Sequence, residues 1–180
     1  MVISMRRFIV IIALALGLLA AALDLAAGAV ADDVWPRYVI AKRRFQNNLH
    51  GLLVHKWQDL ETTLQRQHDQ QQALLAIQDM QFRWLLENHP DRVVTDAGLE
   101  GLANFEWTGA DTDSLRSQNS EFAHLEAFVA TANEKLAADP QLDEARRRMT
   151  MISSDDDFME MVERFDAYLR QLEARLAATD

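Results

Sequence analysis

The stretch FQNNLHGLLVHKWQDLETTL, residues 45–64, decides the fold because its large apolar side chains recur every three or four residues. That spacing puts them on one face of a helix and is typical of a helix with a single buried stripe. The pattern continues to Leu85, and no proline interrupts the chain between Pro36 and Pro90. Proline suits the first turn of a helix, and the residue before a proline is disfavoured within one. The sequence therefore predicts one continuous helix from Pro36 to Asn88.

A helix of this length would be about 80 Å long, which is too long to wrap around a compact core. We expect it to lie alongside later helices in an antiparallel bundle or coiled-coil arrangement that covers its apolar stripe. The stripe consists of Phe45, Leu49, Leu53, Trp57, Leu60, Leu64, Leu74, Ile77 and Leu85.

Residues 91–112 are less regular, because three glycines lower the helix propensity there. We expect this segment to be an irregular connector that contains one short helix.

Three further helices are expected after the connector. One residue of the pair Asp113-Ser114 caps the first. Asp139-Pro140 ends that helix and begins the second, with Asp139 as the N-cap, and one residue of Ser153-Ser154 caps the last. No strand-like alternation is present, so the expected fold class is all-α, with an N-terminal membrane or signal helix followed by a long-helix antiparallel bundle. The stripes of the three helices are Leu115, Phe122, Leu125, Val129, Ala132 and Leu136; Leu142, Ala145, Met149 and Ile152; and Phe158, Met161, Phe165, Leu172 and Leu176.

The N-terminus has the pattern of an export signal or a membrane anchor. Two arginines precede an unbroken apolar run over residues 8–23, and after Asp24 small apolar residues continue to Ala31. One interpretation is a secretory signal that is cleaved before Asp32. The other is a retained anchor over residues 8–31, with Asp24 near the outer interface, where a carboxylate is tolerated.

Both interpretations divide the chain into residues 1–31, the signal or anchor, and residues 32–180, an extracytoplasmic helical bundle. The arginines keep the N-terminus in the cytoplasm. We expect a single-pass protein of the bacterial inner membrane with its C-terminal domain outside the cytoplasm, or alternatively a soluble periplasmic protein after cleavage.

The composition argues against several classes of function. The chain has 28 acidic and 18 basic residues and a net charge of -10, so we expect no nucleic-acid partner. It has no cysteine, which excludes disulfides and thiol nucleophiles.

No pattern of residues predicts a metal site or a catalytic centre. His50 and His55 are five residues apart, so they point to different faces of a helix. Asp111-x-Asp113 begins like a calcium loop, but Phe122 stands where the loop needs its glutamate. We expect the acidic run Asp155–Asp157 to stabilise a helix N-terminus rather than to bind a cation. The expectation is a non-enzymatic protein without metal or cofactor.

The most unusual feature is a polar interruption of the long apolar stripe. Gln67, His68 and Gln71 take positions that a packed helix would fill with leucine or isoleucine. Two explanations stay open. This part of the helix is less buried than the rest, or it forms a polar layer that fixes the helix register or opens the bundle to a partner.

The same region resembles the LemA family of membrane-anchored helical proteins. The resemblance lies in the segment WQDLETTLQRQHDQQQALL, residues 57–75, and in the order of an apolar N-terminal segment followed by long helices. It implies a retained anchor and an extracytoplasmic bundle, and it brings no catalytic residue. The residues that carry it are Trp57, Leu60, Glu61, Leu64, Arg66, His68, Asp69 and Leu74.

These observations predict a non-catalytic cell-envelope protein that acts as a structural or protein–protein interaction module. Its expected partners are the membrane, through the N-terminal segment, and proteins of the envelope, and the fold class also allows a homo-oligomer. The alternative is a cleaved, soluble periplasmic bundle that binds a small ligand or a client protein. That alternative predicts a cavity beside Gln67 and Gln71.

Overall fold

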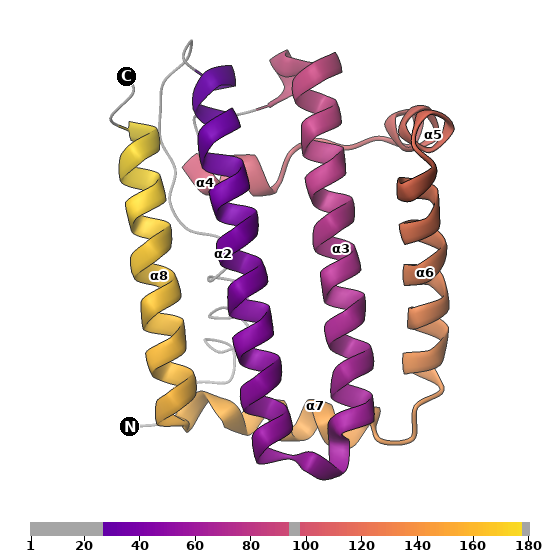
Figure 1. Cartoon of the computed structure of the whole chain (residues 1–180), viewed down its shortest axis with the longest axis vertical. Coiled ribbons are helices and arrows are strands. Elements are labelled where there is room, and N and C mark those ends of the chain that lie inside the picture. The colour runs from indigo at the N-terminus through magenta and orange to yellow at the C-terminus, as the bar shows by residue number, and fades with distance from the viewer. Residues whose placement is uncertain (1–26, 94–97, 178–180) are drawn as a thin grey trace.

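The computed structural model of the chain describes residues 27–93 and 98–177, with side chains from Asp33 onward. Within these ranges all of the regular secondary structure is helical, and there is no strand (Figure 1). The all-α prediction is confirmed.

The predicted 53-residue helix is wrong, because the chain folds back on itself in its middle. Helix α2 (Ala27–Lys56) and helix α3 (Glu61–Asn88) form an antiparallel hairpin joined by the short 3-10 turn η1 (Gln58–Leu60) (Figure 1). Trp57 leaves the helical region, with φ −135° and ψ 66°. Its N–H still donates to Leu53 O at 2.8 Å, and the N–H of Leu60 donates to Trp57 O at 2.9 Å. The reversal therefore leaves these backbone groups paired.

The reversal is favourable because it lets two halves of one apolar stripe pack together. Leu53 of α2 and Leu64 of α3 enter the same buried cluster as Leu60 of the turn. Outside the cluster, Asp59 accepts two hydrogen bonds from the guanidinium of Arg148, at 2.8 and 2.7 Å. A continuous rod would have left this stripe dependent on other helices for cover. The turn contains no glycine or proline, and its apolar residues keep a helical spacing, so the sequence gives no sign of it.

Two further long helices extend the hairpin into a row. Helix α8 (Asp156–Ala177) packs against α2, and helix α6 (Ser120–Ala137) packs against α3, so the order across the row is α8, α2, α3, α6 (Figure 1). Helix α7 (Leu142–Met151) and the turn η3 (Ile152–Ser154) cross the end of the row beside η1. At the opposite end lie the turn η2 (Pro90–Arg92), helix α4 (Gly98–Ala103), which contacts α8, and helix α5 (Gly109–Gln118), which contacts α6.

The helix starts after the connector differ from the predicted ones. Helix α5 begins earlier than expected, with Thr108 as its N-cap, and Asn119 ends it and caps α6. Helix α7 begins at Leu142 rather than Pro140. Asp155, not a serine, caps α8, accepting from the N–H of Phe158 at 3.2 Å. At α5, α6 and α8 the observed cap is a side-chain oxygen that accepts a backbone N–H, whereas the N-cap of α7, Gln141, makes no such bond.

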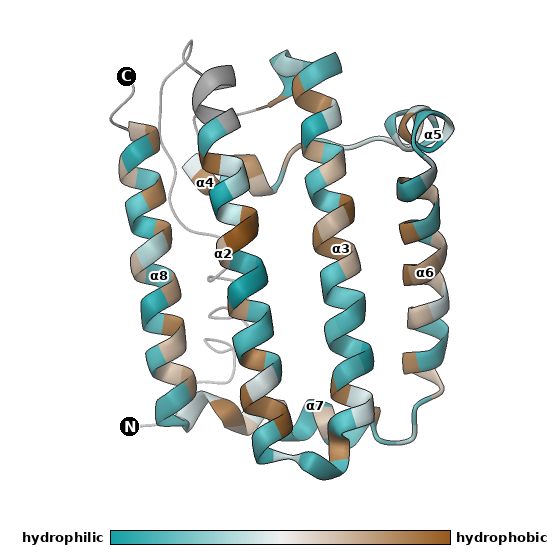
Figure 2. Ribbon diagram, viewed as in Figure 1, coloured by the Kyte–Doolittle hydropathy of each residue, from teal (hydrophilic) through white to brown (hydrophobic). Residues whose placement is uncertain are grey.

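The core consists of two clusters at opposite ends of the α2–α3 hairpin. The end cluster near η2 contains Trp35, whose ring stacks on Phe82 with centroids 4.0 Å apart. The turn cluster near η1 contains Leu60 and Ala145, which are 1% and 0% exposed. Between them, both helices turn hydrophilic, as Figure 2 shows for the middle of α2 and α3. Trp57, expected on the buried stripe, is only half-buried at the turn.

The predicted signal or anchor, residues 1–31, lies outside the described residues except for its last five positions, which belong to the start of α2. None of the helices in the described part of the chain combines the length and apolar character needed to cross a bilayer.

Truncating a leucine in the turn cluster tests the packing there, and truncating an exposed leucine on α3 is the matched control. Leu60 is 1% exposed and Leu74 is 40% exposed. We expect Leu60→Ala to lower the free energy of unfolding by about 2–5 kcal/mol, because it leaves a cavity in the turn cluster. Leu74→Ala should lower it by less than about 1 kcal/mol. Urea unfolding followed by circular dichroism measures both, and equal losses would contradict the observed packing.

Candidate ligand-binding cavity

Polar side chains pair across the middle of the α2–α3 hairpin. Gln72 of α3 donates to Gln46 Oε1 at 3.1 Å and to Asn47 Oδ1 at 3.2 Å. One level nearer the end cluster, Lys42 Nζ donates to Gln78 Oε1 at 3.2 Å. The hairpin is thus held at this level by hydrogen bonds instead of interdigitated leucines.

The same polar layer contains a pair of stacked histidines. The rings of His50 on α2 and His68 on α3 lie 4.4 Å apart between centroids with an interplanar angle of 15°. His50 Nδ1 is buried and has no hydrogen-bond partner. Burial, and then the charge of His50, lower the pKa of His68 below its ordinary value. The His68 ring is therefore best accommodated when it is uncharged.

A cavity of about 620 Å³ opens beside this layer, between α2, α3, α6, α7 and α8. Its wall joins the two core clusters: Tyr38 belongs to the end cluster, and Leu53 and Phe158 belong to the turn cluster. Most of its lining is apolar. The lining consists of Tyr38, Lys42, Phe45, Leu49, Leu53, Gln67, Gln70, Gln71, Asn133, Leu136, Ala137, Leu142, Arg146, Met149, Ile152, Phe158, Val162 and Phe165.

The predicted polar seam divides between the cavity and the histidine pair. Gln67 and Gln71 line the cavity, as expected for a ligand-binding bundle. His68 instead stacks on His50. Beside the seam, Gln70 Nε2 donates to Asn133 Oδ1 and so links α3 to α6 across the cavity wall. The polar residues therefore connect helices and edge a cavity.

Two residues of the site escaped sequence reasoning because their partners lie on the other arm of the hairpin. Lys42 lines the cavity and contacts Gln78, and His50 faces His68. Neither pair has a helical spacing, so only the position of the turn reveals them. The polar residues near positions 42–50 on α2 were the available signal.

The residues that resemble the LemA family do not converge on one site. Leu60 and Leu64 are in the turn cluster, and Trp57 and Glu61 flank the turn. Arg66 reaches the segment between α6 and α7, where its Nη1 lies 2.7 Å from Asp139 Oδ2. His68 joins the histidine pair, while Asp69 accepts a local hydrogen bond from Gln65 and Leu74 is exposed.

Asp139 ties α3 to the start of α7. Its buried carboxylate accepts from Thr63 Oγ1 at 3.0 Å, from Arg66 Nη1 at 2.7 Å and from the N–H of Gln141 at 3.0 Å. These bonds lower the pKa of Asp139, that from Gln141 most strongly. Asp139, which was expected to cap a helix, therefore links α3 to the residue that precedes α7.

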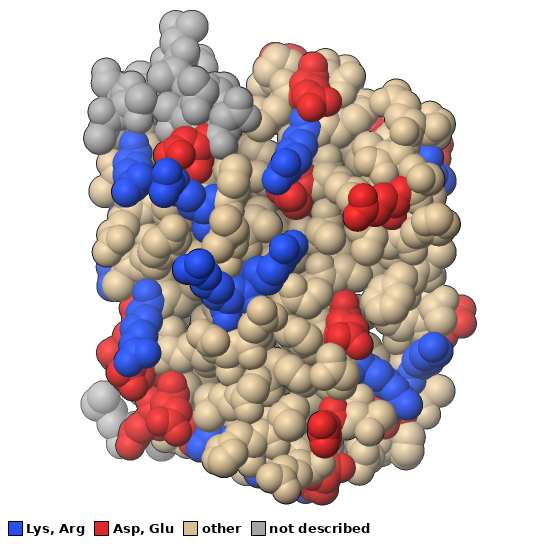
Figure 3. Space-filling view, in the orientation of Figure 1, with Lys and Arg blue, Asp and Glu red and all other residues tan. Residues whose placement is uncertain are grey.

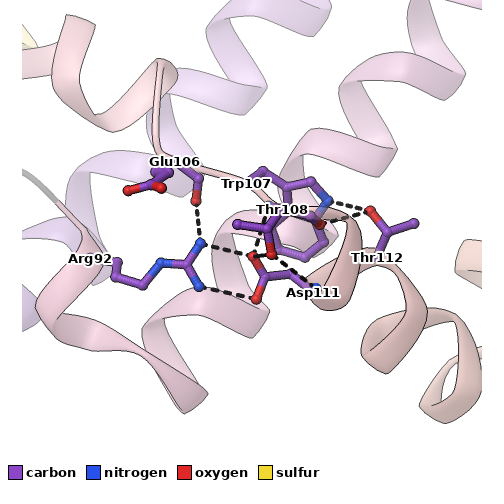
Figure 4. Close-up of polar contacts among 6 residues, drawn as sticks. All are labelled: Arg92, Glu106, Trp107, Thr108, Asp111 and Thr112. Carbon is purple, nitrogen blue, oxygen red and sulfur yellow. Dashed lines mark hydrogen bonds and ion pairs between the residues drawn. The ribbon is translucent and has the colours of Figure 1, made fainter.

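The carboxylate of Asp111, considered above for calcium, is part of a structural clamp (Figure 4). The guanidinium of Arg92 donates to both of its oxygens, at 3.0 and 2.8 Å, and to the carbonyl of Glu106 at 2.8 Å. Thr108 adds its N–H at 2.8 Å and its hydroxyl at 2.7 Å. The Arg92 hydrogen bonds, with smaller contributions from Thr108, hold the pKa of Asp111 well below its ordinary range. The donors leave little room for a cation, and they join η2 to α5.

The remaining charged candidates are also engaged in local structure. Asp155 pairs with Lys56 at 2.6 Å and caps α8. Arg148 pairs with Asp59 and with Glu144. Across residues 27–93 and 98–177, no group of three or more histidines and carboxylates is arranged to hold a metal ion.

No protein-family model matches this chain, and no curated protein and no solved structure matches it either. The LemA resemblance stays a prediction, and the function is argued from the cavity and the polar layer.

The lowered pKa of His68 makes the free energy of unfolding depend on pH. The pKa of His68 is lowered from 6.5, so between that value and the lower folded-state value the unfolded chain binds more protons than the folded one. The contribution of His68 to the free energy of unfolding is therefore complete above pH 6.5 and is lost as the pH falls below that value. We expect His68→Gln to reduce the change in urea midpoint between about pH 8 and about pH 5.

The matched control is His55→Gln, because His55 is exposed on the same helix as His50. It should keep the wild-type pH dependence. Identical pH dependence in wild type and His68→Gln would show that the pKa of His68 does not change on folding.

Proposed function

We propose that the chain is a non-catalytic cell-envelope protein whose helical bundle binds a small, largely apolar ligand in the cavity. The cavity is the observation that carries this proposal. Protein interiors are normally close-packed, with few voids larger than a water molecule. A volume of about 620 Å³ falls within the range of known small-molecule pockets. A largely apolar cavity of that size between packed helices therefore supports a role in binding.

The chemistry of the lining supports an apolar ligand oriented by a few polar groups. Phe45, Leu49 and Phe158 offer apolar surface, while Gln67 and Gln71 supply amide donors and acceptors at the edge. Ligand pockets typically combine a mostly apolar wall with a small number of polar groups that fix orientation. The amides of the two glutamines can orient a bound ligand through hydrogen bonds.

The location in the envelope is part of the proposal and rests on the sequence. The arginines followed by the apolar run of residues 8–23 support export, with the segment either retained as an anchor or removed before Asp32. The resemblance to the LemA family supports the retained anchor.

The structural or partner-binding role predicted first has weaker support than the cavity. Large exposed apolar side chains occur on separate helices, such as Phe128 on α6 at 46% and Met151 on α7 at 59%. Single exposed residues of this kind are ordinary on protein surfaces. On the face shown in Figure 3, acidic and basic side chains both lie among uncharged ones, so this face does not carry charge of a single sign.

A neutral apolar dye tests the cavity without involving charge. N-phenylnaphthylamine should show saturable fluorescence enhancement with the purified full chain, because its emission rises in an apolar pocket. Leu49→Trp and Met149→Trp place an indole in the cavity from two different helices, and each should weaken binding by about tenfold or more. Leu74→Trp is the control, since Leu74 is exposed and does not line the cavity. Its affinity should equal that of the wild type.

Circular dichroism at the assay temperature establishes that each variant is folded. Absence of saturable dye binding to the wild type, or equal affinities in all three tryptophan variants, would overturn the proposed function.

A further inference from the structure

The charged residues that line the cavity are basic, although the chain as a whole is acidic. The protein has 28 acidic and 18 basic residues, yet no aspartate or glutamate lines the cavity. Its charged lining residues are Lys42 on α2 and Arg146 on α7. The cavity of this acidic protein is therefore lined by two cationic side chains and by no carboxylate.

Lys42 is half-buried and lacks the counter-ion that a partly desolvated cation normally has. Its amine contacts the neutral Gln78 oxygen at 3.2 Å and lies 5.6 Å from the centre of the Tyr38 ring. It makes no ion pair with any residue in the described ranges 27–93 and 98–177. Lys56, two turns beyond His50 on the same helix, pairs with Asp155 at 2.6 Å. Removing a charge from water is costly unless an opposite charge compensates it, so Lys42 is poised for an anion.

The two neutral contacts of Lys42 hold its amine without neutralising it. Burial raises the pKa of Tyr38 to about 12, so this phenol stays uncharged and cannot act as the counter-ion. Burial also lowers the pKa of Lys42 itself, which is the cost that a bound anion would offset.

The rest of the cavity extends away from Lys42 along an apolar wall. On α2, Phe45, Leu49 and Leu53 follow Lys42 on one face at helical spacing. The distance along the helix from Lys42 to Leu53 is about 16 Å. Ile152 and Phe158 line the far part of the cavity, in the turn cluster. The wall therefore offers a cation towards one end and a long apolar surface beyond it.

We propose that the ligand is a single-chain amphipathic anion whose head group pairs with Lys42 Nζ and whose apolar chain lies along Phe45, Leu49 and Leu53. This inference rests on the proposed function, since it names the ligand class of the same cavity. Arg146 does not take the head-group role, because its side chain is 65% exposed and already pairs with Asp143 at 3.4 Å.

Calorimetric titration of the full chain with two ligands of equal chain length tests the inference. Decanoate carries the anionic head group and decanol lacks it. We expect decanoate to bind about tenfold or more tightly than decanol, because a hydrogen bond between charged partners in a partly desolvated site is worth about that factor. Lys42→Met should abolish this preference, measured as the ratio of the two dissociation constants.

Two further variants separate charge at position 42 from general effects. Lys42→Arg should keep the preference for decanoate, since the positive charge remains. Arg146→Met should keep it as well, because the head group is placed at Lys42. Equal binding of decanoate and decanol by the wild type, or a preference that survives in Lys42→Met, would overturn the inference while the cavity still binds. Binding of neither ligand would instead overturn the proposed function.

Discussion

The structure depends on one constraint, which is that a single apolar stripe is folded in half at Trp57. The reversal brings Leu53 and Leu64 into one cluster around Leu60, so α2 and α3 cover each other. The Asp59–Arg148 ion pair, 2.7 Å at its shorter contact, attaches the outside of the turn to α7. The positions of the other helices follow from this hairpin, because α8 packs on one arm and α6 on the other.

Folding the stripe in half also determines where the bundle is weakly packed. The apolar residues of α2 and α3 gather at the two ends of the hairpin, and the pairs Gln72–Gln46 and His50–His68 meet in between. Hydrogen bonds hold these helices together without filling the space beside them. The cavity lies at this level, so the residues that interrupt the core are also those that make room for a ligand.

Helical periodicity predicted much of the fold but could not locate its reversal. The seam of α8 was readable, and Phe158, Phe165 and Leu172 are buried as expected. The turn at Trp57 was not, since its residues keep a helical spacing and contain neither glycine nor proline. The cross-helix partners depend on that turn, so Lys42 and its contact Gln78 were out of reach. Gln67 and Gln71 were recognisable from sequence because polar residues break an apolar stripe.

The distance between Arg37 and Arg83 tests the hairpin most directly. Both residues are exposed, and the chain has no cysteine, so Arg37→Cys and Arg83→Cys introduce the only attachment sites for spin labels. Double electron–electron resonance on the doubly labelled full chain measures the separation of the two spin labels. Adjacent packed helices predict a distance of about 10–30 Å between the labels. A distance of about 69 Å, the length of an unbroken helix between these positions, would contradict the hairpin and therefore the cavity between its helices.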